Sequence, residues 1–275
     1  MFGAVPLTKS SQLRKTFVHQ TALVSPSAFL GENVYIGPYC IVGQHVSLGS
    51  GCVLHSHVVI EGRTTLGDDC QLYPFASIGH APQDMKYRGE SSTLSIGKKT
   101  VIREYVTVQP GTKSGVMKTQ VGSSCLLMAS SHVAHDCVVG DGVVMANNAT
   151  LAGHVEVGSG SVIGGLAAIH QFVRIGKSAM VSGTTGVSRD VIPYAVVGPE
   201  DNTLSGLNVV GLKRRGVSAA TVRALRQVYK VLFEETHMTR AQRIATLDTK
   251  VSKIPEVQDV LRFVTSVGKR PLCLS

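Results

Sequence analysis

The sequence predicts a mainly β protein, a parallel β-helix of hexapeptide repeats followed by a small α-helical domain. Three observations support this fold class. Large aliphatic residues recur every six positions between Val24 and Ile192, small residues recur four positions after them, and Gly often follows the aliphatic residue directly. Six is not a multiple of the 3.6-residue helical turn, and a Gly in every turn or two of a helix would cost roughly 1 kcal/mol each.

Each hexad is expected to form a short strand and a corner, so that three hexads make one three-sided coil. The aliphatic side chain points inward, and coils stack at about the 4.8 Å spacing of neighbouring strands. The phase holds from Val24 to Ile78 and resumes, one residue later, from Val121. We therefore expect an N-terminal segment over residues 1–16, a β-helix over 17–193 and a basic α-helical domain over 194–275.

The six cysteines raise the question of disulfides or bound metal. Five of them occupy the small-residue position of a hexad, where they fill corners as small hydrophobes, and no CxxC spacing occurs. We expect reduced thiols, no Cys-based zinc site, and neither metal nor another cofactor. The five are Cys40, Cys52, Cys70, Cys125 and Cys137, and Cys273 lies outside the repeat.

The net charge of +9 is concentrated near the C-terminal end. Residues 211–275 hold 13 Lys and Arg against 5 Asp and Glu, whereas residues 1–210 hold 14 against 13. The basic segment lacks aromatic interleaving and any nucleic-acid motif, so an acidic protein partner or an anionic substrate is favoured over nucleic acid. No apolar run approaches the roughly 18 residues that cross a bilayer, so no transmembrane segment is expected.

The N-terminal stretch carries Lys9, Arg14, Lys15 and several Ser residues before the first acidic residue, Glu32. This composition is weakly similar to that of an organellar transit peptide, which suggests a mitochondrial location. An ordinary chain terminus explains it equally well, and the bacterial cytoplasm is then the expected compartment.

Two interruptions of the repeat are expected to form loops on the scaffold, where function is often found. The first spans residues 80–94 and contains groups suited to an anionic or sugar ligand, among them Gln83, Asp84 and Lys86. The second, over residues 113–120, is short and contains Gly. A tolerated surface insertion without a function is the alternative for both.

Beyond Pro193 the hexads stop and helix signals begin. Ser218 can cap a helix with one apolar stripe, Thr239 begins a second helix, and Pro255 with Glu256 begins a third. The stripe is expected to pack against the β-helix or neighbouring helices. It comprises Val222, Leu225, Val228 and Leu232.

Stacking predicts a polar cluster on one face of the β-helix. Because residue i lies beneath residue i+18 in an uninterrupted coil, His135 is expected beneath Gly153, which lies beneath Gln171. Histidines beside an unhindered backbone N–H can activate a hydroxyl by general-base catalysis and stabilise an oxyanion. The same face contains Asp136, His154, His170 and Phe172.

A second column, made of Asn147, Gly165 and Gly183, is expected on an adjacent face. Two stacked residues without side chains leave a groove there, and an alkyl chain could fill it.

Four segments carry a specific resemblance: VAHDCVVGDGVVMANNATLAGHVEVG, GGLAAIHQFVRIG, GLKRRG and, in the first loop, PQDMKYRGE. With them, residues 17–275 resemble the UDP-N-acetylglucosamine O-acyltransferase family of lipid A biosynthesis. The resemblance implies a left-handed β-helix and a homotrimer with active sites between neighbouring subunits. It also implies transfer of an (R)-3-hydroxyacyl chain from the phosphopantetheine arm of acyl carrier protein to the 3-hydroxyl of UDP-N-acetylglucosamine, without another cofactor.

By match of motif, the resemblance makes His135 the general base, Asp136 its orienting partner and the N–H of Gly153 the oxyanion donor. Neighbouring residues on a strand point to opposite sides, so a contact between Asp136 and His135 requires a corner there. The resemblance further makes Gly183 the position that sets acyl chain length and Arg214 a phosphate contact, and the basic helical domain would attract acyl carrier protein. The other substrate-binding residues it implies are Gln83, Asp84, Lys86, His132, Asn147, His154, Gly165, His170 and Gln171.

Two departures bear on substrate contacts, because Gln109 stands where many relatives have His and PEDN at 199–202 differs from their usual sequence.

Three other interpretations remain open. One is the related N-acyltransferase that acts on UDP-3-O-acyl-glucosamine. Another is a zinc hydratase of the γ-carbonic anhydrase type with His132, His135 and His154 as ligands. The third is a scaffold without activity.

Overall fold

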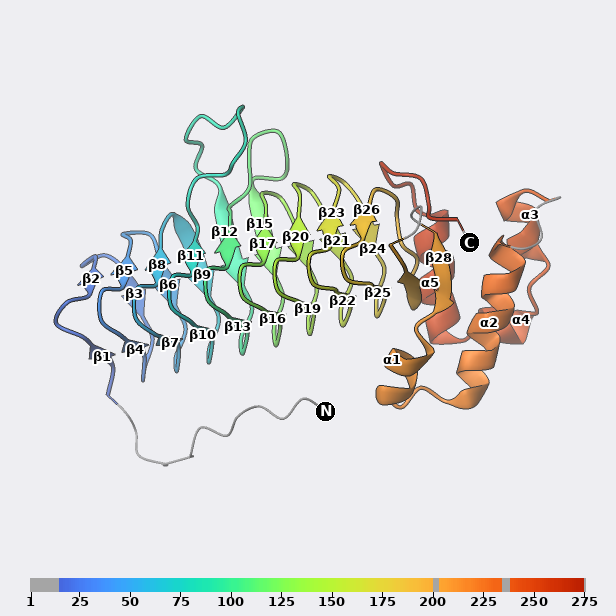
Figure 1. The fold of residues 1–275 in the computed structure, drawn as a ribbon, viewed down its shortest axis with the longest axis horizontal. Helices are drawn as coiled ribbons and strands as arrows, with labels where there is room; N and C mark the ends of the chain where they lie inside the picture. The colour runs from blue at the N-terminus through green and yellow to red at the C-terminus, as the bar shows by residue number, and fades with distance from the viewer. Residues whose placement is uncertain (1–14, 200–202, 234–237, 275) are drawn as a thin grey trace.

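The chain forms an elongated three-sided β-helix that ends in a group of helices (Figure 1). The computed structural model describes residues 15–199, 203–233 and 238–274. Most strands are two residues long, and each belongs to one of three sheets, which we name A, B and C. The parallel β-helix expected from the hexapeptide pattern is confirmed, with helices after it.

The strands pair in parallel within each sheet, except β27 and β28, which are antiparallel. Sheet A contains β1 (Phe17–Val18), β4 (Tyr35–Ile36), β7 (Val53–Leu54), β10 (Gln71–Leu72), β13 (Val101–Ile102), β16 (Leu126–Leu127), β19 (Val144–Met145), β22 (Val162–Ile163), β25 (Met180–Val181), β27 (Ala195–Val197) and β28 (Leu204–Leu207). Sheet B contains β2 (Leu23–Val24), β5 (Ile41–Val42), β8 (Val59–Ile60), β11 (Ser77–Ile78), β14 (Thr107–Val108), β17 (His132–Val133), β20 (Thr150–Leu151), β23 (Ala168–Ile169) and β26 (Gly186–Val187). Sheet C contains β3 (Phe29–Leu30), β6 (Ser47–Leu48), β9 (Arg63–Leu66), β12 (Thr93–Ile96), β15 (Lys118–Val121), β18 (Val138–Val139), β21 (Glu156–Val157) and β24 (Arg174–Ile175).

Three corners connect the sheets, and the chain passes through the A–B, B–C and C–A corners in turn. After the second loop, residue i pairs with residue i+18, as His132 does with Thr150 and Thr150 with Ala168. The stacking register expected from the sequence is therefore confirmed. Corner residues such as Asp136, with φ of 58°, and His154, with φ of 61°, adopt the left-handed backbone conformation that turns the chain sharply.

Aliphatic side chains fill the interior of the coils along the whole axis. Burying each one contributes about 1.5–3 kcal/mol relative to exposure. The five cysteines of the repeat fill corners as expected, and these five and Cys273 are all buried free thiols. Burial raises the pKa of the Cys137 thiol to about 12, which keeps it protonated and unreactive. Fully buried members of the stack are Ile36, Leu54, Leu72, Ile102, Leu127, Met145 and Leu151.

Both loops leave the coil at the B–C corner and project from the same side of the molecule, next to β12 and β15 (Figure 1). The first loop lies between β11 and β12, and the second lies between β14 and β15. The strands begin earlier than the sequence suggests, since Thr93 and Lys118 already pair with each other in sheet C. The two loops therefore stand side by side over one edge of the β-helix.

Five helices follow the strands within residues 203–233 and 238–274, and the three expected ones are confirmed. The Ser218 hydroxyl accepts a hydrogen bond from the Thr221 N–H at 3.1 Å, Thr239 and Gln242 form a capping box, and Pro255 opens the last helix. The sequence did not predict the short helices α1 and α4. The helices are α1 (Val209–Arg214), α2 (Ala219–Phe233), α3 (Arg240–Ala245), α4 (Thr249–Ser252) and α5 (Pro255–Thr265).

The apolar stripe of α2 is buried as expected, with Leu225 and Val228 each 1% exposed. Lys177 of the β-helix pairs with Asp259 of α5 at 3.0 Å, which joins the helices to the last coils. No helix in the described ranges is both long and apolar enough to cross a membrane.

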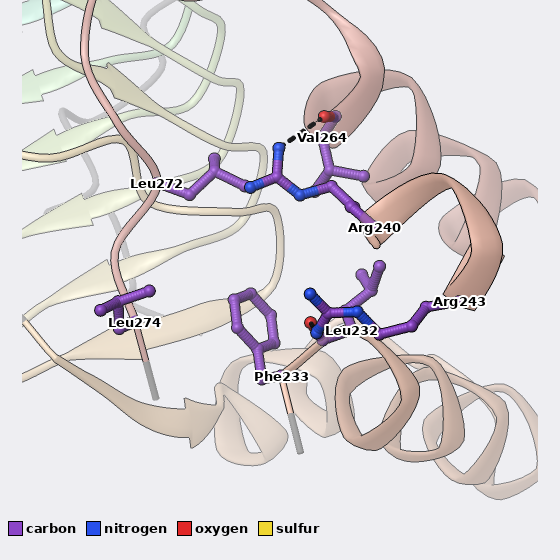
Figure 2. Close-up of a pocket in the computed structure, with 7 residues that line it drawn as sticks. All are labelled: Leu232, Phe233, Arg240, Arg243, Val264, Leu272 and Leu274. Carbon is purple, nitrogen blue, oxygen red and sulfur yellow. Dashed lines mark hydrogen bonds between the residues drawn. The ribbon is translucent and has the colours of Figure 1, made fainter. Parts of the chain in front are cut away.

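A cavity of about 240 Å³ lies between the helices and the C-terminal segment (Figure 2). Its walls are mostly apolar, and Arg243 Nε there is buried without a hydrogen-bond partner in the described part of the chain. The C-terminal segment is thus packed less closely on its helix side than on its β-helix side. The cavity is lined by Leu232, Phe233, Arg240, Arg243, Val264, Leu272 and Leu274.

Candidate active site

The candidate base His135 lies at the B–C corner, two residues after the end of β17. The positive φ of Asp136 turns its side chain back toward its neighbour, and His135 Nδ1 lies 3.0 Å from Asp136 Oδ2. The corner that this contact requires is therefore present. Both residues are buried, with exposed fractions of 6% and 4%. A carboxylate at Nδ1 favours the tautomer that leaves the Nε2 lone pair free to accept a proton.

The second loop surrounds the Asp136 carboxylate with hydrogen-bond donors. Oδ2 accepts from the N–H of Thr112 at 3.0 Å and from its hydroxyl at 2.7 Å, and Oδ1 accepts from the N–H of Val116 at 2.9 Å. Burial opposes ionisation of Asp136, but these bonds, the bond to His135 and the charge of His154 outweigh it and hold the pKa of Asp136 below its usual value. Asp136 is therefore a carboxylate beside His135 at neutral pH.

The sequence predicts the second loop, but the sequence reasoning missed its contacts with Asp136. Thr119 Oγ1 accepts from the Asp136 N–H at 2.8 Å, and a Cβ at Gly115 would lie 2.2 Å from the Asp136 carboxyl carbon. Only a residue without a side chain allows the loop to approach that closely. The small Gly and Thr residues of the loop were the available signal, but their partner is about twenty residues away in the chain.

Gly153 lies directly above His135, as the stacking arithmetic predicts. A Cβ at Gly153 would lie 2.4 Å from His135 Cε1 and 2.5 Å from Nε2. Gly153 is buried, and its backbone N–H donates no hydrogen bond within the described residues. Corner amides at this position are commonly unpaired in the coil, but this one has an imidazole beneath it. The pair therefore combines a base with an unoccupied donor.

His154 and Phe172 extend the site along the same corner. The His154 ring lies edge-on to His135 at 5.0 Å between centroids and stacks on Phe172 at 4.5 Å. Burial is the main cause that lowers the pKa of His154, and the charges of His135 and Lys269 add to it, while those of Asp136 and Asp84 oppose it. His154 is therefore neutral at pH 7, so it donates a hydrogen bond at one ring nitrogen and accepts one at the other.

His132 occupies the strand before the corner. Its Nδ1 lies 2.6 Å from the hydroxyl of Thr107 on the coil below. Burial, with a smaller contribution from the charge of His135, lowers the pKa of His132. Its ring is thus a neutral, fixed group beside the candidate base.

The zinc interpretation requires three ligands that converge on an open position. The structure brings together ligand atoms of His135, Asp136 and His154 within 4.8 Å, instead of the expected set with His132. The Asp136 oxygens already accept bonds from Thr112, Val116 and His135. The carboxylate is thus engaged as a hydrogen-bond acceptor, which suits an oriented base better than a metal ligand.

The first loop lies at the same B–C corner as His135. The Gln83 N–H donates to the side-chain oxygen of Gln109 at 3.1 Å, so the buried Gln109 anchors the start of the loop. Asp84 is half-buried and Lys86 is exposed. Asp84 Oδ1 accepts from the Lys86 N–H at 2.9 Å, and this turn presents both side chains in one loop beside the corner.

His170 and Gln171 lie two coil steps above the base and contact the C-terminal segment. Arg270 Nη2 lies 2.7 Å from His170 Nδ1, and Arg270 Nε donates to the Gln171 carbonyl at 2.9 Å. Lys269 Nζ lies 4.1 Å from the centre of the Phe172 ring. The sequence reasoning missed these two cations, because nothing in the local pattern places a segment a hundred residues away against this corner.

The groove column lies at a different corner of the same subunit. Asn147, Gly165 and Gly183 follow sheet A strands and occupy the A–B corner, one sheet away from His135. A Cβ at Gly165 would make an ordinary contact of 3.4 Å with the Asn147 carbonyl oxygen, whereas one at Gly183 would lie 3.2 Å from the Gly165 carbonyl oxygen, so a side chain has room at Gly165 and little at Gly183. The column is present, but one chain does not bring it to the base.

Arg214 also lies apart from the base in this chain. It is exposed in the last turn of α1, whereas the neighbouring Arg215 donates to Ser178 Oγ and to the Gly160 carbonyl at the C–A corner. Residues 200–202 of the PEDN segment lie outside the described residues.

Known family models match two parts of the chain. A bacterial transferase hexapeptide model of six repeats matches residues 27–62 and 118–153, and a model of UDP N-acetylglucosamine O-acyltransferase domain 2 matches residues 190–273. Among curated proteins, the acyl-[acyl-carrier-protein]–UDP-N-acetylglucosamine O-acyltransferase of Caulobacter vibrioides is 49% identical, over 94% of this chain and 97% of its own. The chain belongs to the UDP-N-acetylglucosamine O-acyltransferase family.

Two further members of this O-acyltransferase family support the assignment. The enzyme of the same name from Thermodesulfovibrio yellowstonii is 45% identical over 93% of this chain and 98% of its own. The solved structure of UDP-N-acetylglucosamine O-acyltransferase from Moraxella catarrhalis matches with a TM-score of 0.88 at 39% identity, over 93% of this chain and 98% of that one. The left-handed coil of the family's β-helix confirms the expected hand.

The two curated family members described above come from bacteria, and they lend no support to the mitochondrial location expected from the N-terminus. Most of the transit-like stretch, residues 1–14, lies outside the described residues.

Proposed function

We propose that this protein catalyses the first step of lipid A biosynthesis, the transfer of an (R)-3-hydroxyacyl chain from acyl carrier protein to the 3-hydroxyl of UDP-N-acetylglucosamine. One observation carries the proposal beyond family membership. The buried His135 imidazole is hydrogen-bonded to Asp136 at 3.0 Å and lies against Gly153, whose N–H donates to no group among the described residues. Base and oxyanion donor are the two groups that acyl transfer to a hydroxyl requires.

The chemical step follows from this pair. His135 Nε2 accepts the proton of the sugar hydroxyl while the oxygen of that hydroxyl attacks the thioester carbonyl carbon. The carbonyl oxygen becomes negative and accepts a hydrogen bond from the Gly153 N–H. The C–S bond then breaks, the thiolate leaves on the phosphopantetheine arm, and imidazolium supplies its proton. The Asp136 carboxylate stabilises the imidazolium between the two proton transfers.

The acceptor sugar nucleotide is assigned to the first loop and the B–C corner. Gln83, Asp84 and Lys86 offer amide, carboxylate and ammonium groups beside the corner, which match the hydroxyls and phosphates of such a ligand. Further polar rings and amides line the approach to His135. These are His132, His154, His170 and Gln171.

The acyl groove requires a second copy of the chain, because Asn147, Gly165 and Gly183 lie at the A–B corner, away from His135. The same corner carries a row of stacked, exposed rings, in which Phe75 lies 5.1 Å from Tyr105 and their exposed fractions are 47% and 59%. Exposed apolar rows of this kind mark subunit contacts. We therefore assign a homotrimer in which the A–B corner of one subunit faces the B–C corner of the next.

The basic helices are assigned to acyl carrier protein. Residues 211–275 carry a net charge of +8, from 13 basic against 5 acidic residues, and an acidic carrier would be attracted to them over the range of the Debye length. Arg214, exposed on α1, would meet a phosphate of the nucleotide or of the pantetheine arm.

The test is mass spectrometry of UDP-N-acetylglucosamine incubated with a panel of hydroxyacyl carrier proteins. We expect one O-acylated product, absent with the His135→Ala variant while the oligomer stays folded, since His135 fills no part of the aliphatic stack. Turnover near that of the wild type in His135→Ala would refute the assignment of the base. Stoichiometric zinc in the purified protein together with no acyl transfer would favour the hydratase instead.

A further inference from the structure

The C-terminal segment is fixed on the last coil of the β-helix by a buried ion pair. Arg174 Nε lies 2.8 Å from Asp190 Oδ2, and Asp190 is fully buried. Arg174 Nη1 also donates to Ser266 Oγ at 2.7 Å. A Cβ at Gly268 would lie 2.4 Å from Asp190 Oδ2, so this residue passes directly over the ion pair.

A second anchor follows a few residues later. The Asp190 N–H donates to the Pro271 carbonyl at 2.8 Å, and the Cys273 N–H donates to the Asp190 carbonyl at 2.8 Å. Cys273 is fully buried. Lys269 and Arg270 lie between the two anchors, so their backbone is held against the β-helix on both sides.

The two cations therefore meet the candidate active site in a defined position. Arg270 contacts His170 and Gln171, and Lys269 covers the Phe172 ring. In the described part of the chain, neither cation forms an ion pair with a carboxylate. Two positive charges without an anionic partner beside a substrate site attract an anion.

Arg270 also decides which nitrogen of His170 carries the proton. A guanidinium is always protonated and only donates, so His170 Nδ1 accepts from Arg270 at 2.7 Å. The longer contact of 3.3 Å between Nδ1 and the Gln171 carbonyl is then no hydrogen bond, because both atoms are acceptors. The His170 N–H is left on Nε2, where it adds a third donor to the ammonium of Lys269 and the free guanidinium nitrogen of Arg270.

We propose that Lys269 and Arg270, held over Phe172 and His170, form a binding site for a phosphate group of one of the two substrates. This inference rests on the proposed function, in which both substrates carry phosphate. The diphosphate of the sugar nucleotide and the phosphate of the pantetheine arm have the same chemistry toward a Lys–Arg pair. The contacts continue from Lys269 through Phe172 and His154 to His135, so a phosphate here would sit at the outer end of the catalytic corner.

The test compares ligands with and without phosphate by isothermal titration calorimetry. UDP is paired with uridine, and 4′-phosphopantetheine with pantetheine, on the full-length wild type and on the Lys269→Gln and Arg270→Gln variants. In one of the two pairs, we expect the affinity advantage of the phosphate to fall at least tenfold in each variant. A fall in the UDP pair assigns the site to the acceptor, and a fall in the phosphopantetheine pair assigns it to the donor.

Conservative and distant variants complete the design. Lys269→Arg and Arg270→Lys keep the charge and should retain most of the affinity advantage that the phosphate gives. Lys98→Gln removes an exposed charge at the C–A corner and should leave this affinity advantage unchanged. Steady-state kinetics should show the effect in KM, with kcat largely retained.

Two outcomes are unfavourable, and they differ in what they overturn. If the wild type binds both phosphate ligands and the advantage stays unchanged in Lys269→Gln and Arg270→Gln, or if only kcat falls, the phosphate site is wrong while the proposed function stands. If the wild type binds neither UDP nor phosphopantetheine, the proposed function fails, and this inference fails with it.

Discussion

At the residue scale, the chemistry depends on the backbone conformation of a single corner. Asp136 follows His135 directly, and on an extended strand the two side chains would point to opposite faces. The φ of 58° at Asp136 brings its carboxylate to 3.0 Å from the imidazole. The second loop then holds that carboxylate with three hydrogen bonds from Thr112 and Val116. The proposed base is therefore oriented before any substrate arrives.

Asp136→Asn should lower kcat about 100- to 10,000-fold, because a neutral amide neither stabilises the imidazolium nor fixes the same tautomer. The pKa of Asp136 in the folded state lies below its usual value, so ionisation of this carboxyl stabilises the fold above a pH of about 4. This stabilisation is lost as the pH falls through the lower pKa of the folded state. The difference in free energy of unfolding between wild type and variant should thus be constant from pH 6 to 8 and shrink below about pH 4. Denaturant titrations across this range and steady-state kinetics test both statements, and a wild-type rate in the variant would contradict the role of Asp136.

Gly153→Ala should lower kcat/KM by about 100-fold or more, because the new Cβ would lie 2.4 Å from His135 Cε1 and displace the ring. The matched control is Gly186→Ala on a later coil, where a Cβ meets nothing within 4 Å and activity should stay near that of the wild type. Steady-state assays measure kcat/KM of both variants and of the wild type. Equal activities would mean that the space above His135 is not part of the reaction.

At the element scale, two of the three corners of the coil carry different parts of the proposed site. The B–C corner carries both loops, the proposed base and the proposed oxyanion donor, whereas the A–B corner carries the column of Gly165 and Gly183. The loops stand side by side because they interrupt the repeat at the same corner of successive coils (Figure 1). The rigid stack beneath them keeps these spacings constant.

Gly183→Met should shift the donor preference toward shorter acyl chains, because a side chain there fills part of the proposed groove. Each methylene that loses its buried position costs about 0.8 kcal/mol, a factor of about four in binding. Competition assays with carrier proteins of different acyl lengths measure the shift, and Gly186→Met, outside the groove, serves as the control. An unchanged chain-length profile would place the groove elsewhere.

At the scale of the whole molecule, a single chain holds all parts of the proposed site but not in one place. His135 and the groove column lie at different corners, and the row of exposed rings that includes Phe75 and Tyr105 runs along the A–B corner. A neighbouring copy that covers this row would bring its B–C corner to the groove. The assembly is thus the proposed catalytic unit.

A homotrimer with shared sites predicts that two inactive variants restore activity when their subunits mix. Gly183→Trp blocks the groove and His135→Ala removes the base, yet an interface with an intact His135 on one side and an intact Gly183 on the other remains complete. Random mixing after refolding should restore roughly a quarter of the sites. Light scattering should give a native mass near three chains of 29.1 kDa. A monomer, or no activity in the mixture, would contradict the shared site.

The sequence by itself determined the coil, its register and most of the candidate site. A six-residue period leaves one regular solution in which aliphatic side chains are buried, and residue i then lies beneath i+18, so the pairing of His135 with Gly153 was predictable from counting alone. The first turns of the helices near Ser218, Thr239 and Pro255 were also predictable from the sequence, because capping depends on residues within one turn.

Only the tertiary structure decided what surrounds that column. The second loop holds Asp136 through two backbone N–H groups and the Thr112 hydroxyl from twenty or more residues away in the chain, and Arg270 reaches His170 from a hundred residues away. Contacts of this kind depend on how distant segments meet in space, whereas stacking in a solenoid depends only on the period of the sequence.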